Sequence, residues 1–159
     1  VTVDLGDPVT DLVPDHPNVV VLRTFSKAYG LAALRTGYGV ADPSVAEQVD
    51  KVLIPFAVNH LAQKGSLAAI AARDEVQVVI DRLTAERDRV VVALRDGGWE
   101  VPDAHANFVW LPLGGRTDEV FPEVERQGVV VRPFPGVGIR VTIGTPAEND
   151  RFLAALARL

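Results

Sequence analysis

Three side chains in the first quarter of the sequence have the chemistry to hold a phosphorylated carbonyl compound. Ser26 and Lys27 closely follow the apolar run Val19–Leu22, and Arg35 comes eight residues after Lys27. An amine can form an imine with a carbonyl group, while a hydroxyl and a guanidinium can bind a phosphate. Ligands bind at the carboxyl ends of strands in α/β sheets, so we expect a site here. On spacing alone, ordinary surface charges are the alternative for Lys27 and Arg35.

A second group of candidate residues lies near the other end of the chain. Arg140 belongs to the alternating run IRVTI, which predicts a strand over residues 139–143. A planar guanidinium on a strand is suited to bidentate binding of a carboxylate. Arg132 stands eight residues earlier and is a further candidate for binding an anion. The alternatives are an exposed edge-strand arginine for Arg140 and a surface ion pair for Arg132.

The lysine-containing segment closely resembles a known family motif. Residues Thr24–Tyr38, with the sequence TFSKAYGLAALRTGY, resemble the lysine motif of fold-type I aminotransferases that use pyridoxal 5'-phosphate. The version is that of the histidinol-phosphate and aromatic amino acid aminotransferases, within the class II aminotransferases. The resemblance continues through Pro55–Asn59, Ala106–Val109 and Gly138–Asp150. It covers nearly the whole chain from Asn18 onward.

The resemblance implies a role for each candidate residue. Lys27 forms the imine with pyridoxal phosphate and then moves the proton between the substrate Cα and the cofactor. Ser26 and Arg35 bind the cofactor phosphate. Arg140 binds the substrate α-carboxylate, and Arg132 faces the part of the active site that holds phosphate-bearing substrates.

The resemblance also implies an enzyme that moves an amino group between an aromatic amino acid or histidinol phosphate and 2-oxoglutarate. Its partners would be amino-acid and 2-oxo-acid substrates and a second copy of the chain in a homodimer. Phe108–Leu113 resembles the aromatic members more, which favours aromatic substrates. A decarboxylase of the threonine-phosphate type and a truncated, non-catalytic domain are the alternatives.

One part of the family pattern is not found. Family members pair the pyridine nitrogen with an aspartate that a tyrosine closely follows, on a strand before the lysine strand. Asp4 is the nearest match, but no tyrosine follows it. We therefore expect the chain to correspond to the C-terminal half of such an enzyme and to be incomplete for activity.

The hydrophobic pattern predicts the elements that position these residues. We expect an α/β fold that is a partial fold-type I transferase, with the end of the large-domain parallel sheet and a small α+β C-terminal domain. Residues 1–60 would belong to the large domain and residues 61–159 to linking helices and the small domain. Trp110 is expected in the core. The expected strands are 19–22, 36–41, 107–113, 128–132 and 139–143, and the expected helices begin near residues 43, 61, 74, 117 and 146.

Composition excludes several classes of protein. The 159 residues include 48% hydrophobic and 23% charged side chains, which is typical of a globular domain. A net charge of −5 argues against nucleic-acid binding, and no apolar run is long enough for a membrane span. With no cysteine and three histidines, we expect no metal site. The expected location is the cytoplasm.

Overall fold

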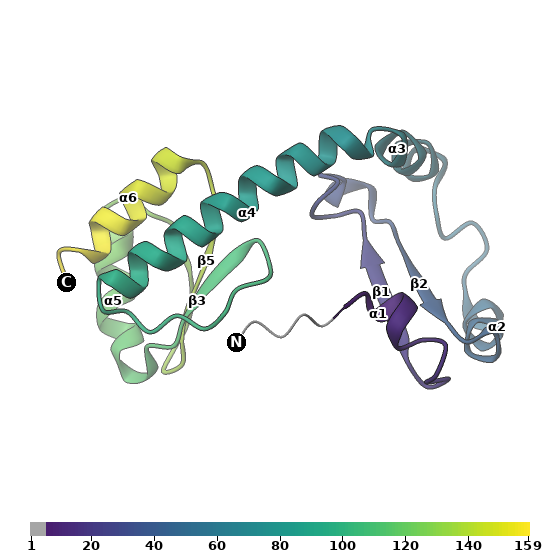
Figure 1. Ribbon diagram of the computed structural model, residues 1–159, viewed down its shortest axis with the longest axis horizontal. Coiled ribbons are helices and arrows are strands. Elements are labelled where there is room, and N and C mark those ends of the chain that lie inside the picture. The colour runs from purple at the N-terminus through teal and green to yellow at the C-terminus, as the bar shows by residue number, and fades with distance from the viewer. Residues whose placement is uncertain (1–5) are drawn as a thin grey trace. The chain divides into compact units, whose positions relative to one another are not determined.

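The computed structural model describes residues 6–159, so Asp4 lies outside the described residues. The chain divides into two compact units, one ending at Val78 and the other formed by Val79–Leu159. The division falls within the long helix α4, Arg73–Asp96, drawn in teal in Figure 1. The domain boundary at residues 60 and 61, which concerns the longer enzyme, stays a prediction.

The first unit contains a two-stranded antiparallel sheet, with helices before and after it in the chain. Asp42 caps helix α2 by accepting a hydrogen bond from the Ser44 N–H, and a proline at the first helical position favours this start. Asn59 caps helix α3 in the same way through Ala62. The elements, in order, are α1 (Pro8–Asp11), β1 (Val20–Thr24), a 3₁₀ turn (Ala32–Leu34), β2 (Gly37–Ala41), α2 (Pro43–Val52) and α3 (His60–Ala71).

The first strand differs from the interpretation that its apolar run favours. Such a run is typical of a strand buried on both faces, but Leu22 is 78% exposed while Val21 is buried. Strand β1 pairs antiparallel with β2, from Val20 opposite Ala41 to Thr24 opposite Gly37. A parallel neighbour needs a crossover connection to a further strand, and the described residues of this unit supply none.

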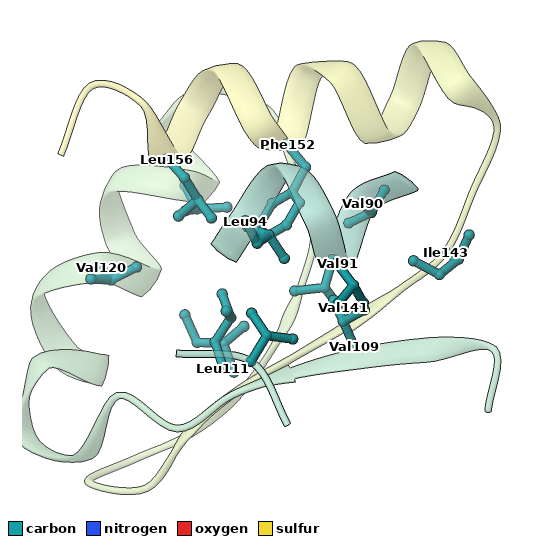
Figure 2. Close-up of a cluster of buried hydrophobic side chains, with 13 residues drawn as sticks. Val90, Val91, Leu94, Val109, Leu111, Val120, Val141, Ile143, Phe152 and Leu156 are labelled. Carbon is teal, nitrogen blue, oxygen red and sulfur yellow. The ribbon is translucent and has the colours of Figure 1, made fainter. Parts of the chain in front are cut away.

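The second unit is an α+β layer pair, as expected. Its three-stranded sheet has the order β3-β5-β4 with antiparallel pairing throughout. Helices α4, α5 and α6 pack their apolar side chains against one face of this sheet (Figure 2). The elements that follow α4 are β3 (Phe108–Leu111), a 3₁₀ turn (Gly114–Arg116), α5 (Thr117–Arg126), β4 (Arg132–Phe134), β5 (Gly138–Thr142) and α6 (Pro146–Leu156).

Alternation along the strands decides which side chains form the core of this unit. Every second residue of β3 and β5 points to the helices, and the intervening ones point to the opposite face, called here the outer face of the sheet. Burial of this apolar surface is the main source of stability of the unit. The largest contributors from the sheet and the helices include Val109, Leu111, Ile139, Val141, Val90, Leu94, Val124, Phe152 and Leu156.

The fourth expected strand is shifted along the chain. The valine run predicted a strand over 128–132, whereas β4 begins at Arg132. Gly128 follows the end of α5 with a φ of 77°, which is favourable for glycine, and the Val129 N–H still bonds to the Val124 carbonyl of the helix. The exit from the helix therefore uses the first residues of the apolar run.

Candidate active site

The pairing of β1 with β2 brings the three N-terminal candidates to one place. The ladder continues one step beyond the strands, because the Phe25 N–H donates to the Thr36 carbonyl at 3.2 Å. Ser26 and Lys27 follow this bond on one side, and Arg35 precedes it on the other. The backbone pairing therefore brings the three candidate positions to the carboxyl end of β1.

The loop between the strands is held by its own backbone. The Leu31 N–H donates to the Phe25 carbonyl and the Gly30 N–H to the Lys27 carbonyl, both at 2.9 Å. Phe25 is 6% exposed, and its ring lies 5.0 Å from that of Tyr29. The loop thus has an anchored base, while the Lys27 side chain stays exposed and available to a ligand.

Arg35 has an unusual backbone conformation for an arginine. Its φ of 54° and ψ of 50° are left-handed, and one of its terminal nitrogens donates to the Ala32 carbonyl at 2.9 Å. That bond leaves further guanidinium donors for an anion. The neighbouring Ser26 is half-buried, and its N–H donates to the Thr24 hydroxyl. A hydroxyl, an ammonium and a guanidinium together fit a phosphate beside an amine that can form an imine.

The C-terminal candidates share the outer face of the second sheet. Trp110, Arg140 and Arg132 lie opposite one another across β3, β5 and β4. Their chain neighbours Ile139 and Val141 point to the core, so the arginine points away from it. The hairpin register therefore brings the two predicted arginines together, in the second unit, whereas Lys27 and its partners belong to the first.

Aromatic rings surround the two guanidinium groups. The guanidinium carbon of Arg140 lies 5.5 Å from the centroid of the Phe108 ring, and that of Arg132 lies 5.2 Å from the Phe134 ring. Trp110 contacts Phe134 edge-to-face at 5.5 Å. The expectation that Trp110 belongs to the core is wrong. Trp110 lies opposite Arg140 on the outer face of the sheet, where it is half-buried.

The charges on this face are not compensated within the described residues. Arg89 and Arg95 each form ion pairs with carboxylates, but no such pair with a described residue is found for Arg132 or Arg140. The Nε of Arg140 is buried without a hydrogen-bond partner. A buried donor without a partner is costly, and like charges directly opposite each other repel. Both costs would be relieved by a bound anion such as a carboxylate.

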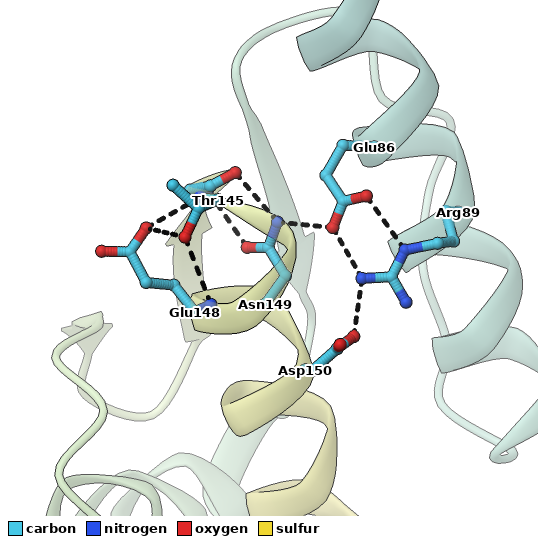
Figure 3. A network of polar contacts seen from close by, with 7 residues as sticks. Glu86, Arg89, Thr145, Glu148, Asn149 and Asp150 are labelled. Atoms are coloured by element: carbon cyan, nitrogen blue, oxygen red, sulfur yellow. Dashed lines mark hydrogen bonds and ion pairs between the residues drawn. The ribbon is translucent and has the colours of Figure 1, made fainter.

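Asn149 organises the junction that follows β5, and sequence reasoning missed it. It is 3% exposed, and its amide bonds to both the N–H and the carbonyl of Gly144 at 3.1 Å. It also donates to Glu86 of α4 at 2.9 Å (Figure 3). Its spacing of three residues before Phe152 and seven before Leu156 puts it on the core face of α6. An asparagine at such a position was the available signal.

Carboxylates around this junction are stabilised in their charged form. Hydrogen bonds from Arg89 lower the pKa of Glu86, aided by the bond from Asn149, and the pKa of Arg89 rises in turn. The Thr145 N–H and hydroxyl lower the pKa of Glu148 within the capping box that starts α6. The strand that carries Arg140 therefore ends in a closely bonded turn.

The fold is that of one family of enzymes. The family model for aminotransferase class I and II matches residues 4–156. The chain belongs to this family. The described residues contain no cluster of metal-ligating side chains and no helix that is long and apolar enough to cross a membrane.

Curated relatives carry more specific names. The chain is 52% identical to an aromatic amino acid aminotransferase of Mycolicibacterium paratuberculosis over 90% of its own length and 40% of the relative's. It is 53% identical to that of Thermobifida fusca, covering 89% of this chain and 40% of the relative. The chain thus spans about two fifths of the length of these relatives.

Solved structures confirm the partial fold-type I architecture. Histidinol-phosphate aminotransferase from Sinorhizobium meliloti, in complex with pyridoxal 5'-phosphate, matches 95% of this chain and 43% of its own, with a TM-score of 0.78 and 31% identity. L-threonine-O-3-phosphate decarboxylase from Porphyromonas gingivalis matches 92% of this chain and 48% of its own, with a TM-score of 0.73 and 26% identity. Pyridoxal phosphate is the cofactor of the aminotransferase family.

Proposed function

We propose that this chain forms part of a pyridoxal-phosphate-dependent aminotransferase that moves an amino group between an aromatic amino acid and 2-oxoglutarate. The chain spans 40% of the length of a curated relative. The proposed activity is therefore that of a protein with the relatives' full length. The observation that carries this function is the placement of Ser26, Lys27 and Arg35 around the end of one strand pair. Histidinol phosphate is the alternative substrate.

Each of these three residues has a distinct task. Lys27 would provide the amine that holds the cofactor carbonyl and would move a proton at the substrate Cα. Arg35 and the Ser26 hydroxyl would hold the phosphate. Pyridoxal phosphate, when bound, supplies the electron sink that makes the Cα proton acidic.

The outer face of the second sheet would bind the substrate. Arg140 binds the α-carboxylate, because its buried Nε lacks a partner and its strand is rigidly terminated. Trp110 and Phe134, which contact each other on the same face, supply an aromatic surface that suits an aromatic side chain. If histidinol phosphate were the substrate, Arg132 would hold its phosphate.

A second copy of the chain and a cytoplasmic location complete the proposed setting. Val52 at the end of α2, and Ile54 and Phe56 in the segment that follows, are 81%, 76% and 98% exposed. An apolar segment of this kind is typical of a surface that another chain covers, which supports a homodimer. The negative net charge and the lack of cysteine are consistent with the cytoplasm.

Covalent labelling tests the role of Lys27. Borohydride reduction of the full-length protein with pyridoxal phosphate, followed by peptide mapping, should place the pyridoxyl group on Lys27. Lys51 and Lys64 are internal controls, since both are outside the loop. Label on either of these and none on Lys27 would contradict the assignment.

Product analysis and substrate comparison test the reaction. Transfer to 2-oxoglutarate without release of carbon dioxide distinguishes a transaminase from a decarboxylase. A larger kcat/KM for phenylalanine than for histidinol phosphate is expected. A larger kcat/KM for histidinol phosphate would identify this phosphate ester as the substrate and Arg132 as the residue that binds its phosphate.

A further inference from the structure

We propose that Phe108 is a positioning residue that holds the guanidinium of Arg140 in the orientation needed to bind a carboxylate. This role of Phe108 depends on the proposed role of Arg140 in substrate binding. It concerns how the arginine is held before the substrate arrives, which the assignment of a carboxylate ligand leaves open.

The sheet register places the two side chains as diagonal neighbours. Phe108 lies opposite Thr142, while Arg140 lies opposite Trp110, two residues further along β3. Residues two apart share one face of a strand, and diagonal neighbours are within reach when one side chain is long. The guanidinium carbon lies 5.5 Å from the ring centroid, within the range of about 6 Å for a cation–π interaction.

Hydrogen bonds hold another arginine of this unit, and the comparison shows what Arg140 lacks. Arg95 donates to the Val101 carbonyl at 3.1 and 2.8 Å and to Asp103 at 3.0 Å. For Arg140, the structure gives the ring of Phe108 as a partner, and its buried Nε is without one. The ring therefore has the role that hydrogen bonds have elsewhere, and it leaves the N–H groups free for a ligand.

Repulsion from the neighbouring strand makes this support necessary. Arg132 lies directly opposite Arg140, and two cations in this arrangement drive each other's side chains apart. A ring with a negative face offsets part of that repulsion. Removing the ring would free Arg140 to adopt other rotamers, so that binding would have to restrict them again. The expected result is a weaker affinity for carboxylates with the chemical step unchanged.

The side chain itself provides the first test, on the 159-residue chain. The Nε–H resonance of Arg140 should be shifted upfield by the ring and should exchange slowly with water. Phe108→Leu should remove the shift and accelerate exchange about 10-fold, whereas Phe108→Tyr should preserve both. Phe134→Leu, the same change beneath Arg132, is the matched control and should leave the Arg140 resonance in place. Unaltered exchange in Phe108→Leu would overturn the positioning role.

Kinetics of the full-length enzyme provide the second test. Phe108→Leu should raise KM for phenylalanine about 10-fold with kcat within about twofold, and Phe108→Tyr should restore KM. Arg140→Lys tests the carboxylate-binding role of Arg140 separately from the positioning role of Phe108. If it leaves KM unchanged, the carboxylate role of Arg140 is wrong. If it raises KM while Phe108→Leu does not, Phe108 has no positioning role although Arg140 binds the substrate.

Discussion

Asn149 donates a hydrogen bond from Nδ2 to Oε1 of Glu86 across 2.9 Å, although the two residues are 63 positions apart in the sequence. The bond joins α6 to α4 at the turn that ends the arginine-bearing strand β5. Because the same amide also bonds to Gly144, one buried side chain links three segments of the second unit.

We expect Asn149→Ala to lower the free energy of unfolding by about 2–3 kcal/mol, because it removes the hydrogen bonds that a buried amide makes with both backbone groups of Gly144 and with Glu86. Urea unfolding of the 159-residue chain measures this loss. Asp150→Ala is the matched control on the same turn, since it removes an exposed ion pair with Arg89 and should cost under about 1 kcal/mol. Equal losses in the two variants would show that burial of Asn149 contributes nothing.

The stability of the second unit should depend on pH through Glu86 and Glu148. Both carboxyls have a lowered pKa in the folded chain, so the unfolded chain binds more protons as the pH falls. Their contribution to the free energy of unfolding is complete above the pKa of an ordinary glutamate, about 4.3. It is lost as the pH falls through the lower pKa values of the folded chain. Urea midpoints measured from pH 7 to pH 3 should decline, with the decline confined to the acid end.

Glu86→Gln should flatten the acid part of this profile, because an amide does not titrate and cannot form the ion pair with Arg89. Glu125→Gln, at an exposed position of α5, is the control and should preserve the wild-type slope. A Glu86→Gln profile parallel to that of the wild type would show that this carboxyl is not a source of the pH dependence.

The second unit should fold without the first. Its core joins a three-stranded sheet to three helices, whereas the first unit exposes Leu22, Ile54 and Phe56. A polypeptide of residues 75–159 should unfold cooperatively in urea and show dispersed amide resonances. A polypeptide of residues 6–74 should tend to aggregate. A disordered 75–159 polypeptide would mean that the core needs the preceding residues.

The 159-residue chain alone should show no measurable transfer of amino groups from phenylalanine to 2-oxoglutarate. The aspartate motif that the family uses for the pyridine nitrogen is not found in its sequence, and the chain covers 40% of its curated relatives. An assay with added pyridoxal phosphate checks this expectation. Turnover equal to that of an ordinary transaminase would show that the remaining part of the relatives is dispensable.

Sequence reasoning predicted the elements well where capping residues mark their ends. Asp42 with its following proline, and Thr145 with Glu148, predicted the starts of α2 and α6 that the structure confirms. It failed for β4, because an apolar run of valines indicates burial or extension but not register. The turn at Gly136, with a φ of 68°, sets that register by pairing Phe134 with Gly138.

For the candidate sites too, local motifs could be predicted from the sequence, whereas contacts that depend on strand register could not. The motif predicted Ser26, Lys27 and Arg35, whose roles stay predictions, and the strand pairing explains why their spacing brings them together. The neighbours of Arg140 could not be predicted, because they depend on which residues of β3 and β4 lie opposite β5. Only a correct register shows that Trp110 belongs beside the arginines.

The left-handed backbone of Arg35 has a consequence for how this position evolves. A non-glycine residue in this conformation is disfavoured by roughly 1–2 kcal/mol, and glycine or asparagine would adopt it more readily. Selection for stability alone would therefore replace the arginine. Glycine at this position would relieve the strain and remove the guanidinium in one step, so the stability of the loop and its capacity to hold a phosphate are opposed, and an ancestral-sequence search for more stable variants should avoid position 35.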